Sequence, residues 1–189
     1  MWNMQDVREQ LEELIAEAEL LAGPLTEAQL NWRPAAGRWS VGECLQHLSV
    51  ATRKFHGCIE KGVAEARREG WKYTGPARMG LMGRVVLWVM EPPVVFAKAK
   101  APAEMMPGGR RKDVLEEFRA AHRAVIAAVP EWMEWDVNRT LVESPLVVKY
   151  PVGVVLRVIA AHGRRHLWQA GVVRAMEGFP EGAKGASGG

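Results

Sequence analysis

Prolines and glycines divide this chain into segments whose apolar residues recur every three or four positions. Such spacing places the apolar side chains on one face of a helix. Breaks fall at Gly23-Pro24, Pro92-Pro93, Pro130 and Gly178, and Ser40 with Glu43 forms a capping box typical of a helix start. Helices are therefore predicted over residues 3–22, 40–69, 78–90, 112–129 and 151–177, with one further turn at Thr26–Leu30.

The predicted fold class is all-α, an antiparallel four-helix bundle with short additional helical turns. Short extended pieces are allowed around residues 140–149, but no run of alternating strands supports an α/β fold. Of the 189 residues, 48% are hydrophobic and 25% charged, which is the balance of a globular protein. We expect one domain over residues 1–177 and a flexible Gly-rich tail over 178–189.

Charge and hydropathy exclude several classes of partner. The formal net charge is only +3, from 25 basic and 22 acidic residues that are interspersed, so no nucleic acid is expected. The most apolar stretch, residues 81–97, is interrupted by Arg84, Glu91 and the proline pair, so no membrane span is expected. The first twenty residues are amphipathic and acidic, unlike a signal peptide.

The two cysteines bear on the compartment. Cys44 and Cys58 lie fourteen positions apart in one predicted helix, a separation of about 21 Å at 1.5 Å per residue, so they cannot bond each other. Free thiols indicate a reducing compartment, and a cytoplasmic location is expected.

The chemistry lies in the histidines. His162 and His166 continue the apolar stripe of the last helix, and their i, i+4 spacing projects both imidazoles from one inward face. Such pairs also arise by chance. Burying two polar rings would cost a few kcal/mol without partners, however, and a metal ion would supply those partners.

His47 is a candidate third ligand. It lies two turns into the second predicted helix, in a row of small residues with Cys44, Ala51 and Cys58 that leaves space around its ring. His56 is nine residues further on, half a turn round the helix, and so points away from His47. His122 is interpreted as a surface or structural histidine.

Two stretches carry a family resemblance. They are Gly37 to Leu48, GRWSVGECLQHL, and His162 to Gln169, HGRRHLWQ, about 115 residues apart. With Leu30-Asn31-Trp32-Arg33-Pro34 before the first stretch, the chain over residues 5–176 resembles the DinB-like (DinB/YfiT) metalloprotein superfamily. The resemblance implies that superfamily's type of four-helix bundle and a metal site formed by His47, His162 and His166.

One position departs from the pattern. Many relatives have an acid after the first histidine of the pair, where this chain has Gly163. The glutamate of an H-E-x-x-H protease is therefore missing. Three neutral imidazoles would still leave a coordination position open, as in catalytic metal sites.

Several neighbours are weaker candidates for substrate or second-shell roles. Cys44 could approach the metal but is expected in the core. Arg165 could anchor an anionic substrate, or be solvated or ion-paired. Gln169 could support His166 or be an edge residue. Trp39 and Trp168 flank the motifs and could wall a pocket, although core packing is their ordinary role.

Two functions remain open. The resemblance implies a metal-dependent hydrolase or a low-molecular-weight-thiol S-transferase acting on a small molecule. The alternative is a non-catalytic metal-binding bundle acting in stress response or dimer assembly. Imidazole ligands suit zinc, nickel, copper or iron(II), and we expect zinc or nickel as the divalent metal. We also expect a homodimer, with the apolar helix 78–90 as either a dimer face or a substrate wall.

Overall fold

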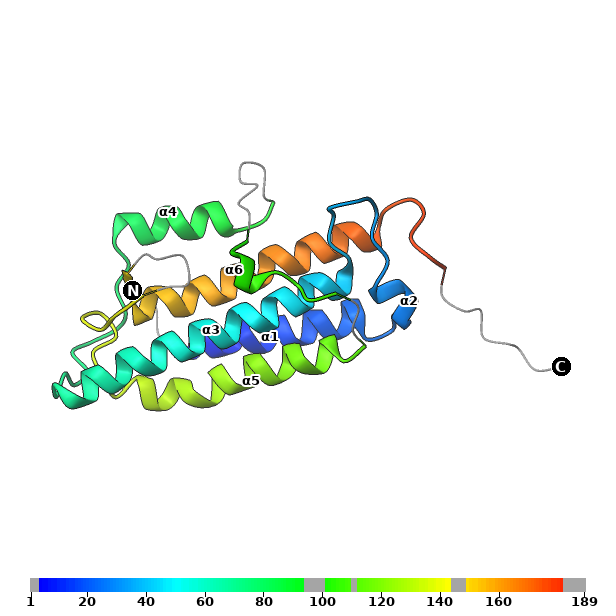
Figure 1. Ribbon diagram of the computed structural model, residues 1–189. Coiled ribbons are helices and arrows are strands. Elements are labelled where there is room, and N and C mark those ends of the chain that lie inside the picture. Colours follow the sequence, from blue (N-terminus) through cyan, green and yellow to red (C-terminus); the bar gives the residue numbers. More distant parts are fainter. Residues whose placement is uncertain (1–3, 94–100, 110–111, 144–148, 182–189) are drawn as a thin grey trace.

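The computed structural model describes residues 4–93, 101–109, 112–143 and 149–181. Four long helices dominate it (Figure 1): α1 (Met4–Ala22), α3 (Val41–Arg68), α5 (Val114–Trp132) and α6 (Val152–Arg174). Shorter elements are α2 (Glu27–Leu30), α4 (Leu81–Met90), a 3₁₀ turn at Ala103–Met105, and the strands β1 (Leu141–Glu143) and β2 (Lys149–Pro151). The prediction of a mainly helical chain is confirmed.

The four long helices pack side by side as a bundle. α3 lies between α5 and α6, and α1 contacts the same two helices. The core consists of the predicted apolar stripes, including Leu11, Leu45, Phe118 and Ile159, each at most 2% exposed. Each helix is stabilised because it buries one apolar face against its neighbours.

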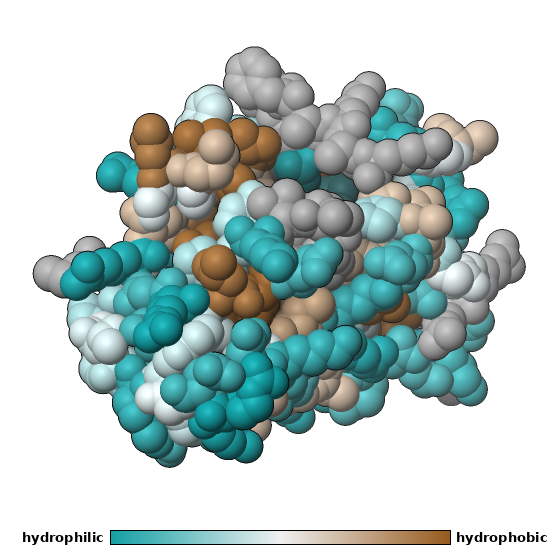
Figure 2. Space-filling view, turned by 60° about the vertical axis from the view of Figure 1, so that its left-hand side comes forward, coloured by the Kyte–Doolittle hydropathy of each residue, from teal (hydrophilic) through white to brown (hydrophobic). Residues whose placement is uncertain are grey.

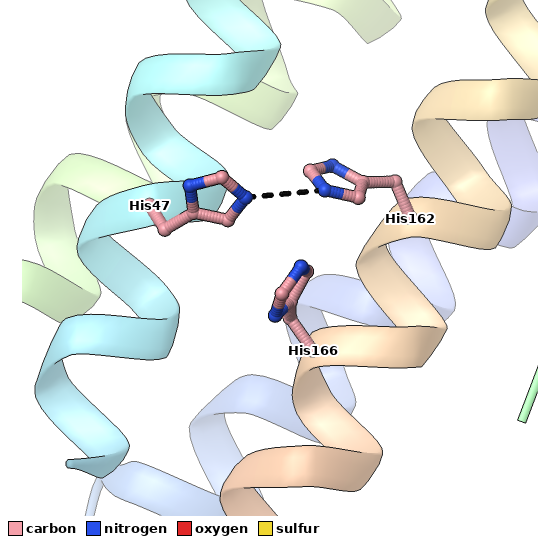
Figure 3. A group of neighbouring side chains, drawn as sticks. All are labelled: His47, His162 and His166. Atoms are coloured by element: carbon pink, nitrogen blue, oxygen red, sulfur yellow. Dashed lines mark hydrogen bonds between the residues drawn. The ribbon is translucent and has the colours of Figure 1, made fainter. Parts of the chain in front are cut away.

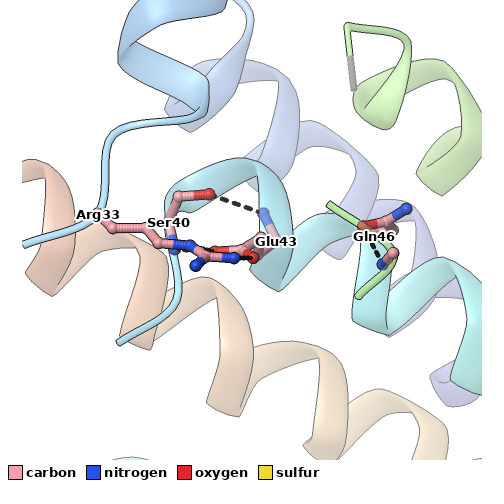
Figure 4. Close-up of polar contacts among 5 residues, drawn as sticks. Arg33, Ser40, Glu43 and Gln46 are labelled. Carbon is pink, nitrogen blue, oxygen red and sulfur yellow. Dashed lines mark hydrogen bonds and ion pairs between the residues drawn. The ribbon is translucent and has the colours of Figure 1, made fainter. Parts of the chain in front are cut away.

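α3 begins where the capping box predicts. The Ser40 hydroxyl accepts a hydrogen bond from the Glu43 N–H (3.1 Å), and the Glu43 carboxylate accepts one from the Ser40 N–H (2.9 Å; Figure 4). Arg33 also donates to this carboxylate from two nitrogens. Burial alone would raise the pKa of Glu43, but the hydrogen bonds from Arg33 and Ser40 hold it below its ordinary value. The charged cap stabilises the end of α3 that carries His47.

Several details of the fold differ from the prediction. α5 continues through Pro130 to Trp132, because a proline in the last turn removes only one backbone hydrogen bond while Val129 and Trp132 remain buried. α6 ends at Arg174, three residues early. The fold is also not purely helical: β1 and β2 pair as a small antiparallel sheet, in the region where short extended pieces were allowed.

The predicted tail is partly packed. Phe179 meets the Trp32 ring edge-on at 5.5 Å, and Gln29 donates to the Pro180 carbonyl at 2.8 Å. These two residues therefore belong to the packed part of the chain. The rest of the predicted tail, residues 182–189, lies outside the described residues.

Two further predictions can be compared with the structure. None of its described helices combines the length and the apolar character that crossing a bilayer requires. Both cysteines are free thiols, as expected, with Cys44 buried and Cys58 half-buried.

Candidate metal centre

The three predicted histidines converge between α3 and α6. His47 projects from the second turn of α3, and His162 and His166 project from successive turns of α6 (Figure 3). The Nε2 atoms of His47 and His162 are 3.2 Å apart. One nitrogen from each ring lies within 4.8 Å of the others. Among the described residues, this is the only group of three or more histidine, cysteine or acidic side chains close enough to hold a metal ion.

The outer nitrogens of two of these rings have protein partners. The Nδ1–H of His47 donates to the Met105 carbonyl at 2.8 Å, and the Nδ1–H of His166 donates to the Gln169 side-chain oxygen at 3.1 Å. Donation from Nδ1 leaves the lone pair on Nε2, the nitrogen that faces the cluster in His47. This arrangement of outer hydrogen bonds is typical of metal-binding histidines.

Burial keeps the cluster neutral. It lowers the pKa of His162 well below 6.5, and proximity to His166 and His47 lowers it further. Burial, with smaller contributions from His47 and Arg165, lowers the pKa of His166 to about 3. Burial also lowers the pKa of His47, against the opposing effect of the Met105 hydrogen bond. Neutral imidazoles are the form that binds metals, so the site needs no deprotonation at neutral pH.

Residues 101–109 lie along α3 beside His47, and the sequence offered no signal for them. Besides the Met105 contact, the Gly108 N–H donates to the Gln46 side chain at 3.0 Å (Figure 4). Lys54 pairs with Glu104 at 3.3 Å. The Met105 side chain is buried. A backbone carbonyl has no residue preference, so its contact with His47 could not be read from a motif.

The two candidate tryptophans have different surroundings. The Trp39 ring lies 4.8 Å from the His47 ring and 5.5 Å from the His166 ring, between centroids. Trp39 therefore forms a wall of the cluster. Trp168 is 41% exposed and lies with Leu20 and Val172 around a different surface hollow.

The three weaker candidates lie in different surroundings. Gln169 contacts His166, as described. Cys44 lies in the hydrophobic core and is not one of the clustered side chains; burial strongly raises the pKa of its thiol. Arg165 contacts the Val89 carbonyl of α4 at 3.3 Å. Its charge contributes to the lowered pKa of His162 and His166, which places it near the cluster.

The remaining two histidines lie outside the cluster. His56 approaches Glu60 at 3.6 Å and the Trp132 ring, away from His47, as the helical geometry predicts. His122 is fully buried, so the surface interpretation is wrong and the structural one holds. Its Nδ1–H donates to the Phe118 carbonyl at 2.9 Å, and its Nε2 has no hydrogen-bond partner among the residues that the structure describes.

The close packing of α1 explains why position 163 is a glycine. A Cβ atom at this position would lie 2.4 Å from Cδ1 of Leu14 in α1, far inside van der Waals contact. α1 thus packs directly on the backbone of α6 beside the histidine pair. An acidic side chain at this position would require the Leu14 side chain to move.

The donor set fits a divalent transition metal. Two imidazole nitrogens bound to one zinc ion at about 2.0–2.1 Å lie about 3.3 Å apart in tetrahedral geometry, and the His47–His162 separation is 3.2 Å. Two Nε2 lone pairs at that distance repel each other unless a proton or a cation lies between them. No carboxylate joins the cluster within the described part of the chain.

One comparison with known proteins found a match. The family model described as the DinB superfamily matches residues 10–170, which include all three histidines. Searches of curated proteins and of solved structures found no significant match.

Proposed function

The chain belongs to the DinB superfamily, and from this premise we propose that it is a metal-dependent enzyme acting on a small molecule. His47, His162 and His166 would hold one divalent ion, zinc or nickel. The reaction would be hydrolysis or transfer to a low-molecular-weight thiol. We also assign the bundle to the antiparallel four-helix type of this superfamily.

The observation that carries the proposal is the convergence of three neutral imidazoles with no fourth protein ligand among the described residues. A three-histidine set leaves a coordination position for a substrate or for water, whereas structural zinc sites close all four positions. A divalent ion there would supply Lewis-acid activation of water or of a thiol.

The protein's own residues would position that chemistry. The Met105 carbonyl and Gln169 orient two of the rings. Trp39 forms an apolar wall beside His47 and His166, which excludes water on that side and strengthens electrostatic interactions. Arg165 supports an anionic group on the substrate, such as a carboxylate or a thiolate.

One observation favours the non-catalytic alternative. No described carboxylate accompanies the three histidines, and Leu14 fills the space beside Gly163. The site therefore lacks an evident general base. A metal that only links α3 to α6 would need none, which fits the alternative of a non-catalytic bundle acting in stress response or dimer assembly.

The first experiment is elemental analysis of the purified protein. We expect about one transition metal per chain, lost in His47→Ala, His162→Ala and His166→Ala. His56→Ala is the matched control, because that histidine lies on α3 outside the cluster, and it should keep its metal. Absence of metal after reconstitution would contradict the proposal.

Activity separates the two alternatives. The loaded protein is assayed for ester and amide hydrolysis and for conjugation of small thiols to electrophiles. We expect turnover that disappears in His162→Ala and persists in His56→Ala. A protein that holds its metal but lacks both activities across a broad substrate panel would support the non-catalytic alternative.

A further inference from the structure

The outer face of α4 is an exposed apolar surface. Leu81 and Trp88 are 80% and 71% exposed, and Met82, Val85 and Val89 are each at least 39% exposed. Figure 2 shows apolar side chains gathered at the upper left of the molecule, where α4 lies. We call these five residues the α4 face. Soluble monomers rarely expose large apolar side chains in such a continuous group.

The helical geometry makes this face a single stripe. At 100° per residue, Leu81, Val85 and Trp88 lie in one row, with Met82 and Val89 beside them. Gly83 lies on the opposite side and is buried. The one charged residue of α4, Arg84, lies at the edge of the stripe, where interfaces carry their charges.

α4 is anchored and cannot turn this face inward. The Arg164 guanidinium of α6 binds the Glu91 carboxylate at the end of α4 through two contacts of 2.5 and 2.9 Å. At the other end, Gly83 lets the α4 backbone approach Val154: a Cβ there would lie 3.4 Å from that side chain. α4 thus forms an outer layer beside α6 (Figure 1). Its apolar stripe points away from the bundle, because these side chains are exposed.

We infer that the α4 face is the interface with a second copy of this chain. Its five apolar side chains offer on the order of 600 Å², most of the roughly 800 Å² that each partner buries in a standard interface. Most soluble oligomers are two-fold symmetric, and their interfaces are self-complementary. Two antiparallel α4 helices meet this condition: Leu81 packs on the partner subunit's Trp88, and Val85 lies beside the two-fold axis.

The composition of α4 favours protein over membrane as the occupant. A helix that lies in a membrane surface usually pairs its apolar face with several Lys or Arg side chains on the other face. α4 carries Arg84 alone, and its opposite side is packed on α6. This interface would use no residue of the histidine cluster.

The test is the mass of the full chain in solution. Sedimentation equilibrium from 1 to 100 μM should give twice the 21.0 kDa chain mass. Val85→Arg and Trp88→Glu should each raise the dimer dissociation constant at least 30-fold. Leu20→Arg is the matched control, because Leu20 is 79% exposed but lies on α1; this variant should remain dimeric.

A cross-link tests the geometry directly. Helix axes about 8–10 Å apart, with Cα atoms about 2.3 Å from each axis, place facing Cα atoms about 3.4–5.4 Å apart, which overlaps the range that a disulfide spans. Val85→Cys in a Cys58→Ser background should therefore oxidise to a covalent dimer, and Leu20→Cys should not.

Three outcomes would overturn the inference. They are a wild-type monomer at every concentration, a dimer that Val85→Arg leaves intact, and a monomer that co-sediments with phosphatidylserine vesicles through α4. Each is independent of the proposed function, because the metal content of Val85→Arg reports on the histidine cluster separately.

Discussion

The three imidazoles of the cluster are held in different ways. His47 is oriented by a backbone carbonyl, which no side-chain substitution removes, whereas His166 is oriented by the side chain of Gln169. His162 faces the His47 ring at 3.2 Å between Nε2 atoms. Of these two orienting partners, only Gln169 can therefore be removed by a side-chain substitution.

Gln169→Leu should weaken metal binding about 10- to 100-fold, the usual effect of removing a partner of a ligating histidine. Competition with a chromophoric chelator measures this affinity. Gln5→Leu is the control, because Gln5 is an exposed glutamine on α1 that contacts Glu9. An unchanged affinity in Gln169→Leu would show that the contact does not orient His166.

His122 couples the stability of the fold to pH. Burial lowers its pKa to about 4, with the Phe118 hydrogen bond opposing the shift. The unfolded chain, with an ordinary pKa of 6.5, therefore binds a proton more readily than the folded protein. The stabilising effect is full above pH 6.5 and is lost as the pH falls from 6.5 towards 4.

His122→Leu should reduce this acid sensitivity. The difference in unfolding free energy between the variant and the wild type should change by about 3 kcal/mol in favour of the variant between pH 7 and pH 4. Urea unfolding of the metal-free proteins at several pH values measures the difference. A difference that does not vary with pH would contradict the assignment of His122 as a buried neutral group.

At the scale of elements, the contact between α1 and α6 determines how closely the histidine pair can approach the core. Leu14 occupies the space that a side chain at position 163 would need. The same helix carries Gly171, where a Cβ atom would meet nothing within 4 Å. An added side chain is therefore sterically hindered at Gly163 and unhindered at Gly171 of the same helix.

Gly163→Ala should lower the unfolding free energy by about 1–2 kcal/mol through overpacking. Gly171→Ala should raise it by up to about 1 kcal/mol through helix propensity. Chemical denaturation measures both values. Adding Leu14→Ala should recover part of the loss in Gly163→Ala, and a failure to do so would locate the strain elsewhere.

At the scale of the whole molecule, the cluster joins two helices that are far apart in sequence. A ligand that binds only the folded chain stabilises it by about 2.7 kcal/mol at a concentration 100 times its dissociation constant. For a chain of this size, each kcal/mol corresponds to about 2–4 °C in melting temperature.

Metal loading should therefore raise the melting temperature by about 5–10 °C, and chelation should reverse the change. Calorimetry of the loaded and chelated protein checks this expectation. His162→Ala should show no metal-dependent shift, whereas His56→Ala should behave like the wild type. A shift of the same size in His162→Ala would mean that the metal binds elsewhere.

Local sequence patterns predicted much of the fold. Hydrogen bonding and side-chain spacing within a single helix explain three features: the helix starts at Ser40 and Thr26, the apolar stripes, and the projection of His162 and His166. Each of these was predicted. Pro130 shows the limit of this reasoning. A local helix-breaking signal was overridden because the burial of Val129 and Trp132 outweighs one lost hydrogen bond.

The sequence by itself determined which residues share a helix face, because a helix repeats every 3.6 residues whatever surrounds it. Only the tertiary structure decided which faces meet. It brought His47 to 3.2 Å from His162, set the Met105 carbonyl against His47, enclosed His122 and placed Leu14 over Gly163. These contacts join residues distant in the chain, and they form because several helices bury their apolar faces together, which no single segment encodes.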